Sequence, residues 1–338
     1  MQELVTYGTR AWGRFDERPV YLNPLDAYGG LGKRLRRFRL KEWVGWTFMH
    51  PELSASMILQ DANYLASSEI YVRDAASQRL TQHSATAAGG SLKLPEALYG
   101  SSPSLRRPGY EVGYVFGPRG GTHEIHVDIA AGRRHGHEEL PIRADLTLDG
   151  SRASAPLSVS QPLRPRGAMY THKLVFPVSG TLAVGEHTYD FDASRDLVIL
   201  DEHKSFLPYR TRWLWGTFAT VEADGIVAAN FCQRPDVAGT PGESCLWVPG
   251  SGGAPVCIGV DPVRFERDSD DPLAAWHATS ADGRLDVTFT PDGRKDVSHQ
   301  LVVFGIDYWQ LYGTWSGTVG ERRVQGVRGV MENMDARL

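Results

Sequence analysis

The chain has 338 residues, of which 41% are apolar and 22% charged, with a formal net charge of −4. These values exclude bulk disorder and a coiled coil, and the small negative charge gives no reason to expect a polyanion as partner. At about 150 residues per domain the length predicts roughly two domains, and 36 Gly with 20 Pro predict many turns and few long helices.

The N-terminus begins Met1-Gln2-Glu3-Leu4 and lacks the basic and apolar regions of a signal peptide. No apolar run approaches the ~20 residues that span a bilayer, so no stable membrane insertion is expected. Three cysteines, an odd number, argue against a disulfide framework. We therefore expect a cytoplasmic protein.

Six basic residues fall within nine positions near the N-terminus, from Lys33 to Lys41. From Arg36 onward basic and apolar residues alternate strictly, which predicts a solvated strand with one basic face. Docking of an anionic substrate tail on this face stays open, whereas nucleic-acid binding is not expected because the chain is net acidic and has no motif for stacking bases. The best helix signal follows at Pro51 to Leu59, although this segment fits a strand as well.

Alternation of apolar and polar residues recurs along the rest of the chain, in 110–115, 123–128 and 284–289 for example. Turn residues bound each run, as is typical of short antiparallel strands. Four Asp-Gly pairs predict hairpin turns, because glycine readily adopts a positive φ. They begin at Asp149, Asp224, Asp282 and Asp292.

Two segments of the first half are echoed in the second. The sequence Trp43-Val-Gly-Trp-Thr-Phe corresponds to Trp213-Leu-Trp-Gly-Thr-Phe, and Gly180-Thr-Leu-Ala-Val-Gly-Glu corresponds to Gly317-Thr-Val-Gly-Glu. A turn and an apolar strand follow the first echo in both halves, and an alternating strand follows the second. Two echoes in the same order predict an all-β chain with a tandem pair of domains.

An ordered set of short segments resembles a bacterial family, the domain of unknown function 2804. The set comprises Lys41-Glu-Trp43, Tyr170-Thr-His-Lys173, Asp201-Glu-His-Lys204, Pro208-Tyr209, Arg212-Trp213, Trp276, Asp282-Gly-Arg284, Phe289-Thr-Pro291 and Gly313-Thr-Trp-Ser-Gly317. The resemblance runs from about Gly32 to Glu332. It implies two tandem lipocalin-like antiparallel β-barrels, in residues 1–198 and 199–338, related to carotenoid 1,2-hydratase, tocopherol cyclase and fungal barrel-type Diels–Alderases.

The resemblance implies no assigned activity, but the functional relatives act on or carry apolar isoprenoid or polyketide-like molecules. The chain departs from the family pattern at Ser244-Cys245, where Glu-Asn is expected. Any role of that Asn is therefore not transferred to this chain.

The most polar unusual stretch is 201–212, between the two repeats. As catalytic candidates we take Asp201, His203, Lys204, Tyr209 and Arg210, with Asp201 or His203 as proton donor. Burial raises the pKa of a carboxylic acid, whereas a neighbouring Lys204 or Arg210 lowers it, and the net sign separates a proton donor from a structural ion pair. The alternative is a salt-bridge network between the domains, because buried charges must pair.

Candidate substrate-binding residues follow in the second repeat. Trp213 and Trp215 lie two apart, hence on one face of a strand, and either pack the end of a barrel or stack on a ligand. Asn230 follows an apolar run, and Glu243 and Trp247 are four apart and share a strand face. Each of these polar residues lies either at the edge of a sheet or in a ligand pocket, and one sequence does not distinguish the two.

No metal and no cofactor are expected. In the segment 123–128, His123 and His126 point to opposite faces of a strand, and the segment 135–138 reads as a solvated hairpin loop. The cysteine spacing matches no paired zinc signature, and dinucleotide, P-loop and serine-hydrolase motifs are missing.

Two functions remain from different classes. The first is a cofactor-independent enzyme performing acid–base chemistry (hydration, cyclisation or isomerisation) on an apolar isoprenoid-like or polyketide-like molecule in a barrel pocket, which requires a dry site, one acid of raised pKa and aromatic walls. The second is a non-catalytic lipid or isoprenoid carrier. In both, the partner is an apolar small molecule.

Overall fold

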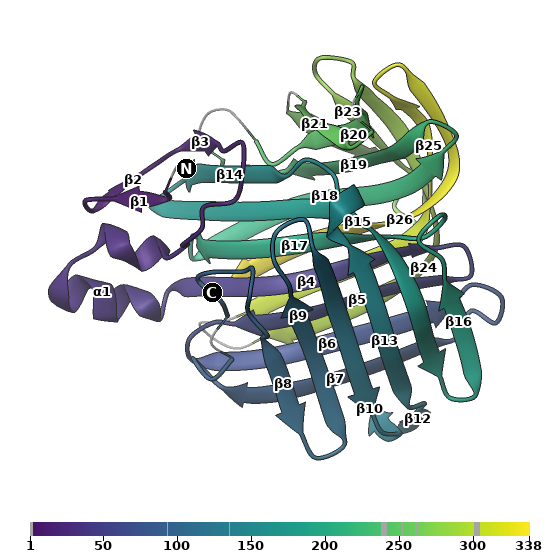
Figure 1. The fold of residues 1–338 in the computed structure, drawn as a ribbon, viewed down its shortest axis with the longest axis horizontal. Coiled ribbons are helices and arrows are strands. Elements are labelled where there is room, and N and C mark those ends of the chain that lie inside the picture. Colours follow the sequence, from purple (N-terminus) through teal and green to yellow (C-terminus); the bar gives the residue numbers. More distant parts are fainter. Residues whose placement is uncertain are drawn as a thin grey trace. The chain divides into compact units, whose positions relative to one another are not determined.

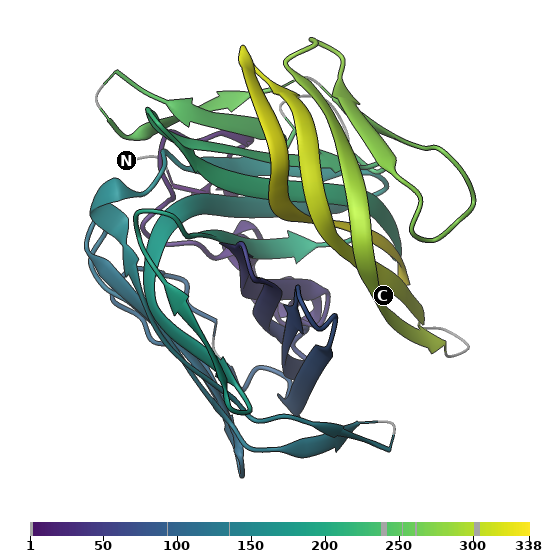
Figure 2. The same ribbon diagram turned by 90° about the vertical axis from the view of Figure 1, so that its right-hand side faces the viewer.

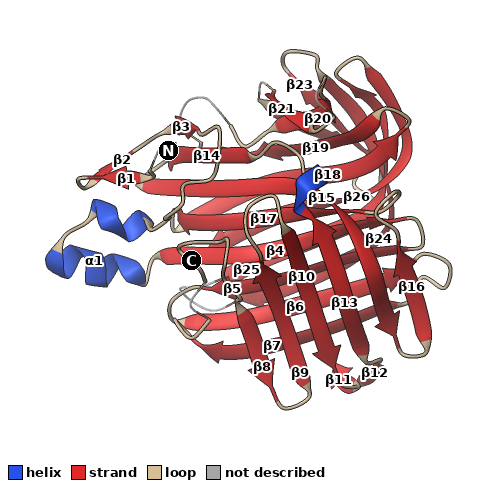
Figure 3. Ribbon diagram, in the orientation of Figure 1, coloured by secondary structure: helices blue, strands red, loops and turns tan. Residues whose placement is uncertain are grey.

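The computed structural model of the chain describes residues 3–92, 94–134, 136–237, 242–251, 253–260, 262–300 and 305–338. Strands dominate these residues, and helix is confined to short segments (Figure 3). The helical segments are η1 (Pro24–Ala27), α1 (Gly30–Arg37) and η2 (Gly150–Arg152). None of the described helices is long and apolar enough to cross a bilayer.

The chain divides into two compact units. Unit 1 comprises residues 1–11, 17–153 and 171–205, and unit 2 comprises residues 12–16, 154–170 and 206–338. The chain therefore passes between the units more than once before it enters the long C-terminal part of unit 2. The division into domains 1–198 and 199–338 stays a prediction.

Unit 1 is built around a path of ten antiparallel strands in the order β7-β6-β5-β4-β17-β15-β13-β10-β9-β8 (Figure 1). The two end strands approach each other, since Arg107 Nε of β8 donates to Thr86 O of β7 at 3.1 Å. The path is thus a nearly closed barrel. Its strands are β4 (Leu40–His50), β5 (Leu53–Asp61), β6 (Leu65–Asp74), β7 (Leu80–Ala88), β8 (Ser104–Arg107), β9 (Tyr110–Phe116), β10 (Thr122–Ile129), β13 (Ile142–Asp149), β15 (Gly167–Val184) and β17 (Leu197–Phe206).

Short strands supplement this path. β1 (Val5–Thr6) pairs with β2 (Thr9–Arg10), β11 (Gly132–Arg134) with β12 (His137–Glu139), and β16 (His187–Phe191) with β15. Within unit 2, β3 (Gly13–Arg14) pairs with β14 (Leu157–Leu163).

Unit 2 contains a nine-strand antiparallel sheet in the order β21-β20-β19-β18-β26-β25-β24-β23-β22. It curls into a half-barrel, and the yellow-green to yellow strands β24, β25 and β26 bend together along their length (Figure 2). The strands are β18 (Arg210–Glu222), β19 (Gly225–Gln233), β20 (Cys245–Pro249), β21 (Pro255–Gly259), β22 (Val263–Arg267), β23 (Trp276–Ser280), β24 (Leu285–Gln300), β25 (Gly305–Val319) and β26 (Arg322–Arg337).

Each unit has its own apolar core, made by alternate residues of its strands because successive side chains point to opposite faces. In unit 1 the core includes Val44, Trp46, Leu174 and Leu200. In unit 2 it gathers around Trp315, whose ring is 5.0 Å from that of Phe231. The predicted all-β class with tandem antiparallel barrels is confirmed, with the second one a curled half-barrel.

Three local predictions need correction or completion. The basic segment from Arg36 is not a strand: α1 runs through Arg37, and β4 begins at Leu40. The segment 51–59 is not a helix: a turn at Pro51 and Glu52 leads into β5, which begins at Leu53. Asp292-Gly293 is not a hairpin turn but lies inside β24 at a β-bulge, where an ion pair of the Asp292 carboxylate with Arg328 holds it to β26.

Two of the three remaining Asp-Gly pairs form the predicted hairpin turns. Those at Asp224 and Asp282 connect β18 to β19 and β23 to β24, whereas the one at Asp149 leads into η2 rather than a hairpin. In η2 the Asp149 carboxylate accepts a hydrogen bond from the Ser151 backbone N–H, as in a helix cap.

The repeat predicted from the two echoes is visible in the strand order. The run β5-β4-β17-β15-β13-β10 of unit 1 corresponds to β19-β18-β26-β25-β24-β23 of unit 2. Gly180 and Gly317 occupy corresponding places in β15 and β25, with φ of +120° and +144°. Each echo therefore lies in strands that hold corresponding places in the two sheets, β4 and β18 for the first and β15 and β25 for the second.

Candidate functional site

Strand β17 contains the first part of the polar stretch 201–212, which was predicted to hold the site. Successive residues of this strand lie on its two opposite faces. Val198 and Leu200 of β17 point into the core of unit 1. By alternation Glu202 and Lys204 share their face, whereas Asp201 and His203 point to the other side. Four consecutive residues thus belong to two separate clusters.

The cluster on the outer face is centred on the Asp201 carboxylate. Its Oδ1 accepts a hydrogen bond from Lys173 Nζ at 2.6 Å and lies 3.2 Å from His203 Nε2, and its Oδ2 accepts one from Trp43 Nε1 at 3.2 Å. His203 belongs to β17 itself, whereas Lys173 comes from β15 and Trp43 from β4, the two strands that flank β17. These side chains meet because their strands are neighbours in the sheet, although Trp43 and Lys173 are far from Asp201 in the sequence.

Asp201 is an anion at neutral pH. Burial disfavours its charged form, but the Lys173 ammonium and then His203 outweigh burial and hold the pKa of Asp201 well below its ordinary value of 3.8. The neighbours predicted to lower it, Lys204 and Arg210, are not the ones that do. Because the net shift of this pKa is downward, the resting carboxylate is an ion-pair partner and not a protonated acid.

The imidazole of His203 is held in a fixed orientation. Its ring is stacked on the indole of Trp43, with centroids 4.3 Å apart and planes 19° apart, and Asp201 lies at its edge. His203 and Lys173 are buried, Trp43 is half-buried, and the Asp201 side chain is 23% exposed. The cluster is therefore largely buried but not sealed from solvent.

The cluster on the core face has a different composition. Arg18 forms a two-pronged ion pair with Glu202, with Nε–Oε2 at 2.6 Å and Nη2–Oε1 at 2.7 Å. Lys204 Nζ donates to Glu42 Oε1 at 2.5 Å and to the Leu94 carbonyl at 3.4 Å. Lys204 is thus brought to Glu42 rather than to Asp201.

His172 is a buried polar residue to which the sequence analysis assigned no role. The residue is 1% exposed, and neither ring nitrogen has a hydrogen-bond partner among the described residues. Burial lowers its pKa to about 3, against the opposing charge of Glu202, so the imidazole is neutral at pH 7. The available signal was the Tyr170–Lys173 segment, which carried the family resemblance.

The other catalytic candidates, Tyr209 and Arg210, belong to unit 2 and precede or begin β18. Both are exposed, and the Tyr209 carbonyl accepts a hydrogen bond from the Leu338 backbone N–H. Asp201, His203 and Lys204 belong to unit 1.

Three of the predicted substrate-binding residues meet in unit 2. Trp215 Nε1 donates to Asn230 Oδ1 at 2.8 Å, and Asn230 Nδ2 donates to the Glu243 carbonyl at 2.6 Å. Trp247 is fully buried and donates to the Ala155 carbonyl at 2.7 Å. These bonds satisfy the polar atoms of both indoles within the protein, as expected of packing residues.

Trp213 takes part in an arrangement that corresponds to the outer cluster of unit 1. Its Nε1 donates to Glu332 Oε1 at 2.8 Å, while Glu332 Oε2 accepts from Tyr308 at 2.9 Å. The guanidinium of Arg234 lies over the indole, 4.9 Å from the ring centroid. Unit 2 therefore keeps the tryptophan–carboxylate pair but replaces lysine and histidine by other groups.

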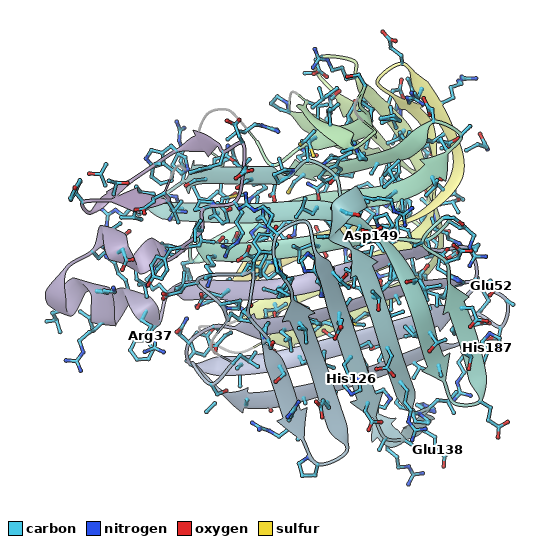
Figure 4. All side chains as sticks on the ribbon, in the orientation of Figure 1. Arg37, Glu52, His126, Glu138, Asp149 and His187 are labelled. Atoms are coloured by element: carbon cyan, nitrogen blue, oxygen red, sulfur yellow. The ribbon has the colours of Figure 1, made fainter. Side chains whose placement is uncertain are left out.

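No group of three or more His, Cys, Asp or Glu side chains in the described ranges is arranged to hold a metal ion. His123 is buried in the unit 1 core, and His126 lies on the outer face of β10 beside Asp145 (Figure 4). His135 lies outside the described residues. Cys232, Cys245 and Cys257 are free thiols.

Comparison with known proteins places this geometry in context. A family described as domain of unknown function (DUF2804) matches residues 18–338, which confirms the resemblance seen in the sequence. No curated protein matches the chain.

Two solved structures are similar in fold. A candidate AttH from Nitrosomonas europaea has a TM-score of 0.53 at 15% identity, over 92% of this chain and 95% of its own. Kievitone hydratase from Nectria haematococca has a TM-score of 0.50 at 12% identity, over 96% of this chain and 98% of its own. At these identities the likeness is one of fold.

Proposed function

The chain belongs to the DUF2804 family, and we propose that it is an enzyme that adds water to, or removes it from, a small organic molecule by acid–base chemistry. His203 is the proposed proton carrier and Asp201 the residue that positions it. The fold shared with a protein named as a hydratase supports this choice among reactions. The proposed substrate is an apolar isoprenoid-like or polyketide-like molecule with a carbon–carbon double bond.

The observation that carries the proposal is the Asp201–His203 pair. A carboxylate that contacts one edge of an imidazole fixes the orientation of the ring and stabilises its protonated form, the arrangement that general acid–base catalysis uses. The Asp201 carboxylate is anionic and anchored by Lys173 Nζ and Trp43 Nε1, so it stays in place while the imidazole gains and loses a proton.

The proposed reaction balances without a further reactant. The imidazolium of His203 transfers a proton to one alkene carbon, the oxygen of water bonds to the neighbouring carbon, and the proton released by that water returns to the imidazole. Positive charge develops on carbon between these steps, and the half-buried indole of Trp43 is an aromatic face of the kind that stabilises such charge. Cyclisation or double-bond isomerisation would use the same first proton transfer.

The test measures solvent-deuterium incorporation by mass spectrometry, with the protein in D₂O and a panel of isoprenoid alkenes. We expect His203→Gln to lower incorporation by about 10²–10⁴-fold, the usual contribution of a general acid–base group, without changing the melting temperature. The matched control is His126→Gln, because His126 Nδ1 is 2.8 Å from Asp145 Oδ1 in an exposed pair. Equal incorporation by His203→Gln and the wild type would exclude His203 as the proton carrier.

A carrier function is the second candidate, and a separate observation favours it. On the core side of unit 1, Trp46 Nε1, Tyr114 Oη and His123 Nδ1 are buried and have no hydrogen-bond partner among the described residues. The rings of Trp46 and Tyr114 are 5.8 Å apart, so two of these polar atoms lie on neighbouring side chains. Native mass spectrometry that finds a co-purified lipid, retained equally by His203→Gln, would favour the carrier.

A further inference from the structure

Helix α1 presents an apolar stripe to solvent. Leu31, Leu35 and Phe38, at the end of the helix, are spaced i, i+4, i+7 and so lie on one side of it. They are 70%, 63% and 58% exposed, and no residue of α1 is buried. A surface helix normally turns such a stripe toward its own core, and this one does not.

Basic side chains surround the stripe. Arg34, Arg36, Arg37 and Arg39 are all exposed, and Figure 4 shows Arg37 on the helix at the edge of unit 1. The nearest basic residue toward the N-terminus, Lys33, is paired with Asp26 at 2.6 Å. The helix therefore carries a strong local positive charge on a protein whose net charge is −4.

The helix is fixed to the barrel beside further exposed apolar residues. Arg37 Nε donates to Asn63 Oδ1 at 3.0 Å, in the connection between β5 and β6. The next two residues, Tyr64 and Leu65, are each about half exposed, and the ammonium of Lys41 lies over the Tyr64 ring. We call Leu31, Leu35, Phe38, Tyr64 and Leu65, with the four exposed arginines, the basic–apolar patch.

We propose that the basic–apolar patch binds the surface of a lipid bilayer that contains anionic phospholipids, with α1 lying in the plane of the interface. Large apolar side chains on one side of a helix and arginines around them match a bilayer, whose headgroups are anionic and whose interior is apolar. A nucleic acid would contact the arginines through its phosphates but would leave the side chains of Leu31, Leu35 and Phe38 exposed to water. The geometry thus points to a reversible surface contact, which would bring the protein to apolar molecules dissolved in the membrane.

The test is sedimentation of the full-length protein with vesicles of phosphatidylcholine containing roughly 30% phosphatidylglycerol, compared with phosphatidylcholine alone. We expect binding to the anionic vesicles only. Leu31→Gln and Leu35→Gln should each weaken it by about tenfold or more, since each removes one side chain from the apolar phase, and Arg34→Gln by about fivefold. The matched control is Leu273→Gln, because Leu273 is 46% exposed and lies next to Asp271 rather than arginines.

Several outcomes would overturn the proposal. These are no binding of the wild type to anionic vesicles, equal weakening by Leu273→Gln, and no effect of the two leucine variants. Sedimentation equilibrium supplies a further one: a dimer in solution that Leu31→Gln and Leu35→Gln dissociate would make the patch a contact between copies of the chain. Tight binding of duplex DNA without vesicle binding would assign the arginines to nucleic acid.

Discussion

The indole Nε1 of Trp43 donates a hydrogen bond to Oδ2 of Asp201 across two neighbouring strands of unit 1, at 3.2 Å. Unit 2 repeats this relationship between Trp213 and Glu332, on strands that hold the corresponding places in its sheet. The pairs differ in what else the carboxylate contacts: Lys173 and His203 in unit 1, and Tyr308 and Gln310 in unit 2. Only the first pair combines a carboxylate with an imidazole.

Asp201→Asn should destabilise unit 1 strongly. The substitution leaves the Lys173 ammonium, whose side chain is 1% exposed, without its counter-charge, and such a loss costs about 3–5 kcal/mol of unfolding free energy. The control, Asp145→Asn, removes an 80% exposed carboxylate and should change stability by at most about 1 kcal/mol. Urea unfolding measures both. Adding Lys173→Met to Asp201→Asn should restore much of the loss, and an unrestored loss would contradict the role of the ion pair.

His172 should make the stability of the protein depend on pH. Its pKa falls from 6.5 in the unfolded chain to about 3 in the folded protein, so between these values the unfolded chain binds more protons. Its contribution is fully present above pH 6.5 and is lost as the pH falls, by up to about 1.4 kcal/mol per pH unit.

His172→Phe should therefore flatten the dependence of the unfolding free energy on pH, measured by urea unfolding at pH 7, 6 and 5. His126→Gln, a change at an exposed histidine, should leave the slope as in the wild type. A wild-type slope in His172→Phe would show that this imidazole does not titrate on unfolding.

Gly180→Ala and Gly317→Ala should both be severely destabilising. Each glycine has a positive φ, and a Cβ atom would lie 2.2 Å from a backbone carbonyl oxygen, that of Asp145 or Asp286. Strain and collision together should cost more than about 3 kcal/mol. Gly283→Ala is the matched control, since its φ is +72° but its surroundings are open, and about 1 kcal/mol is expected. Melting temperatures that fall equally in all three variants would contradict the steric argument.

Alternation along the chain predicted strands that the structure contains, among them β9, β10 and β24. The rule that residues two apart share a strand face also applies to Asp201 and His203, although no strand was predicted for them. The same rule separates Lys204 from Asp201, although the sequence analysis grouped them by their closeness along the chain. Lys173 and Trp43 were not predictable partners of Asp201. They join it only because β15 and β4 flank β17, an order that depends on pairing between strands far apart in sequence.

The basic segment shows how two periods compete in one sequence. Arg37-Phe38-Arg39-Leu40-Lys41 alternates as a strand does, yet Leu31, Leu35 and Phe38 also repeat with the period of a helix. The helix prevails up to Arg37, and β4 begins only where Leu40 can enter the barrel. His172 was missed for another reason: its unpaired nitrogens are a property of the folded interior.

The Arg18–Glu202 pair has a consequence for how the protein is made. Its two residues are separated by 184 positions, and they meet at the core face of a barrel whose last strand is β17. At roughly 5–20 residues per second, a ribosome synthesises Arg18 some 10–40 s before Glu202. For most of that interval β4, which is complete at His50, lacks the neighbour that β17 supplies, and β15, which is complete only at Val184, lacks it for the last ~1–4 s. Unit 1 therefore depends during its synthesis on whatever shields those edges until the strand that joins them emerges.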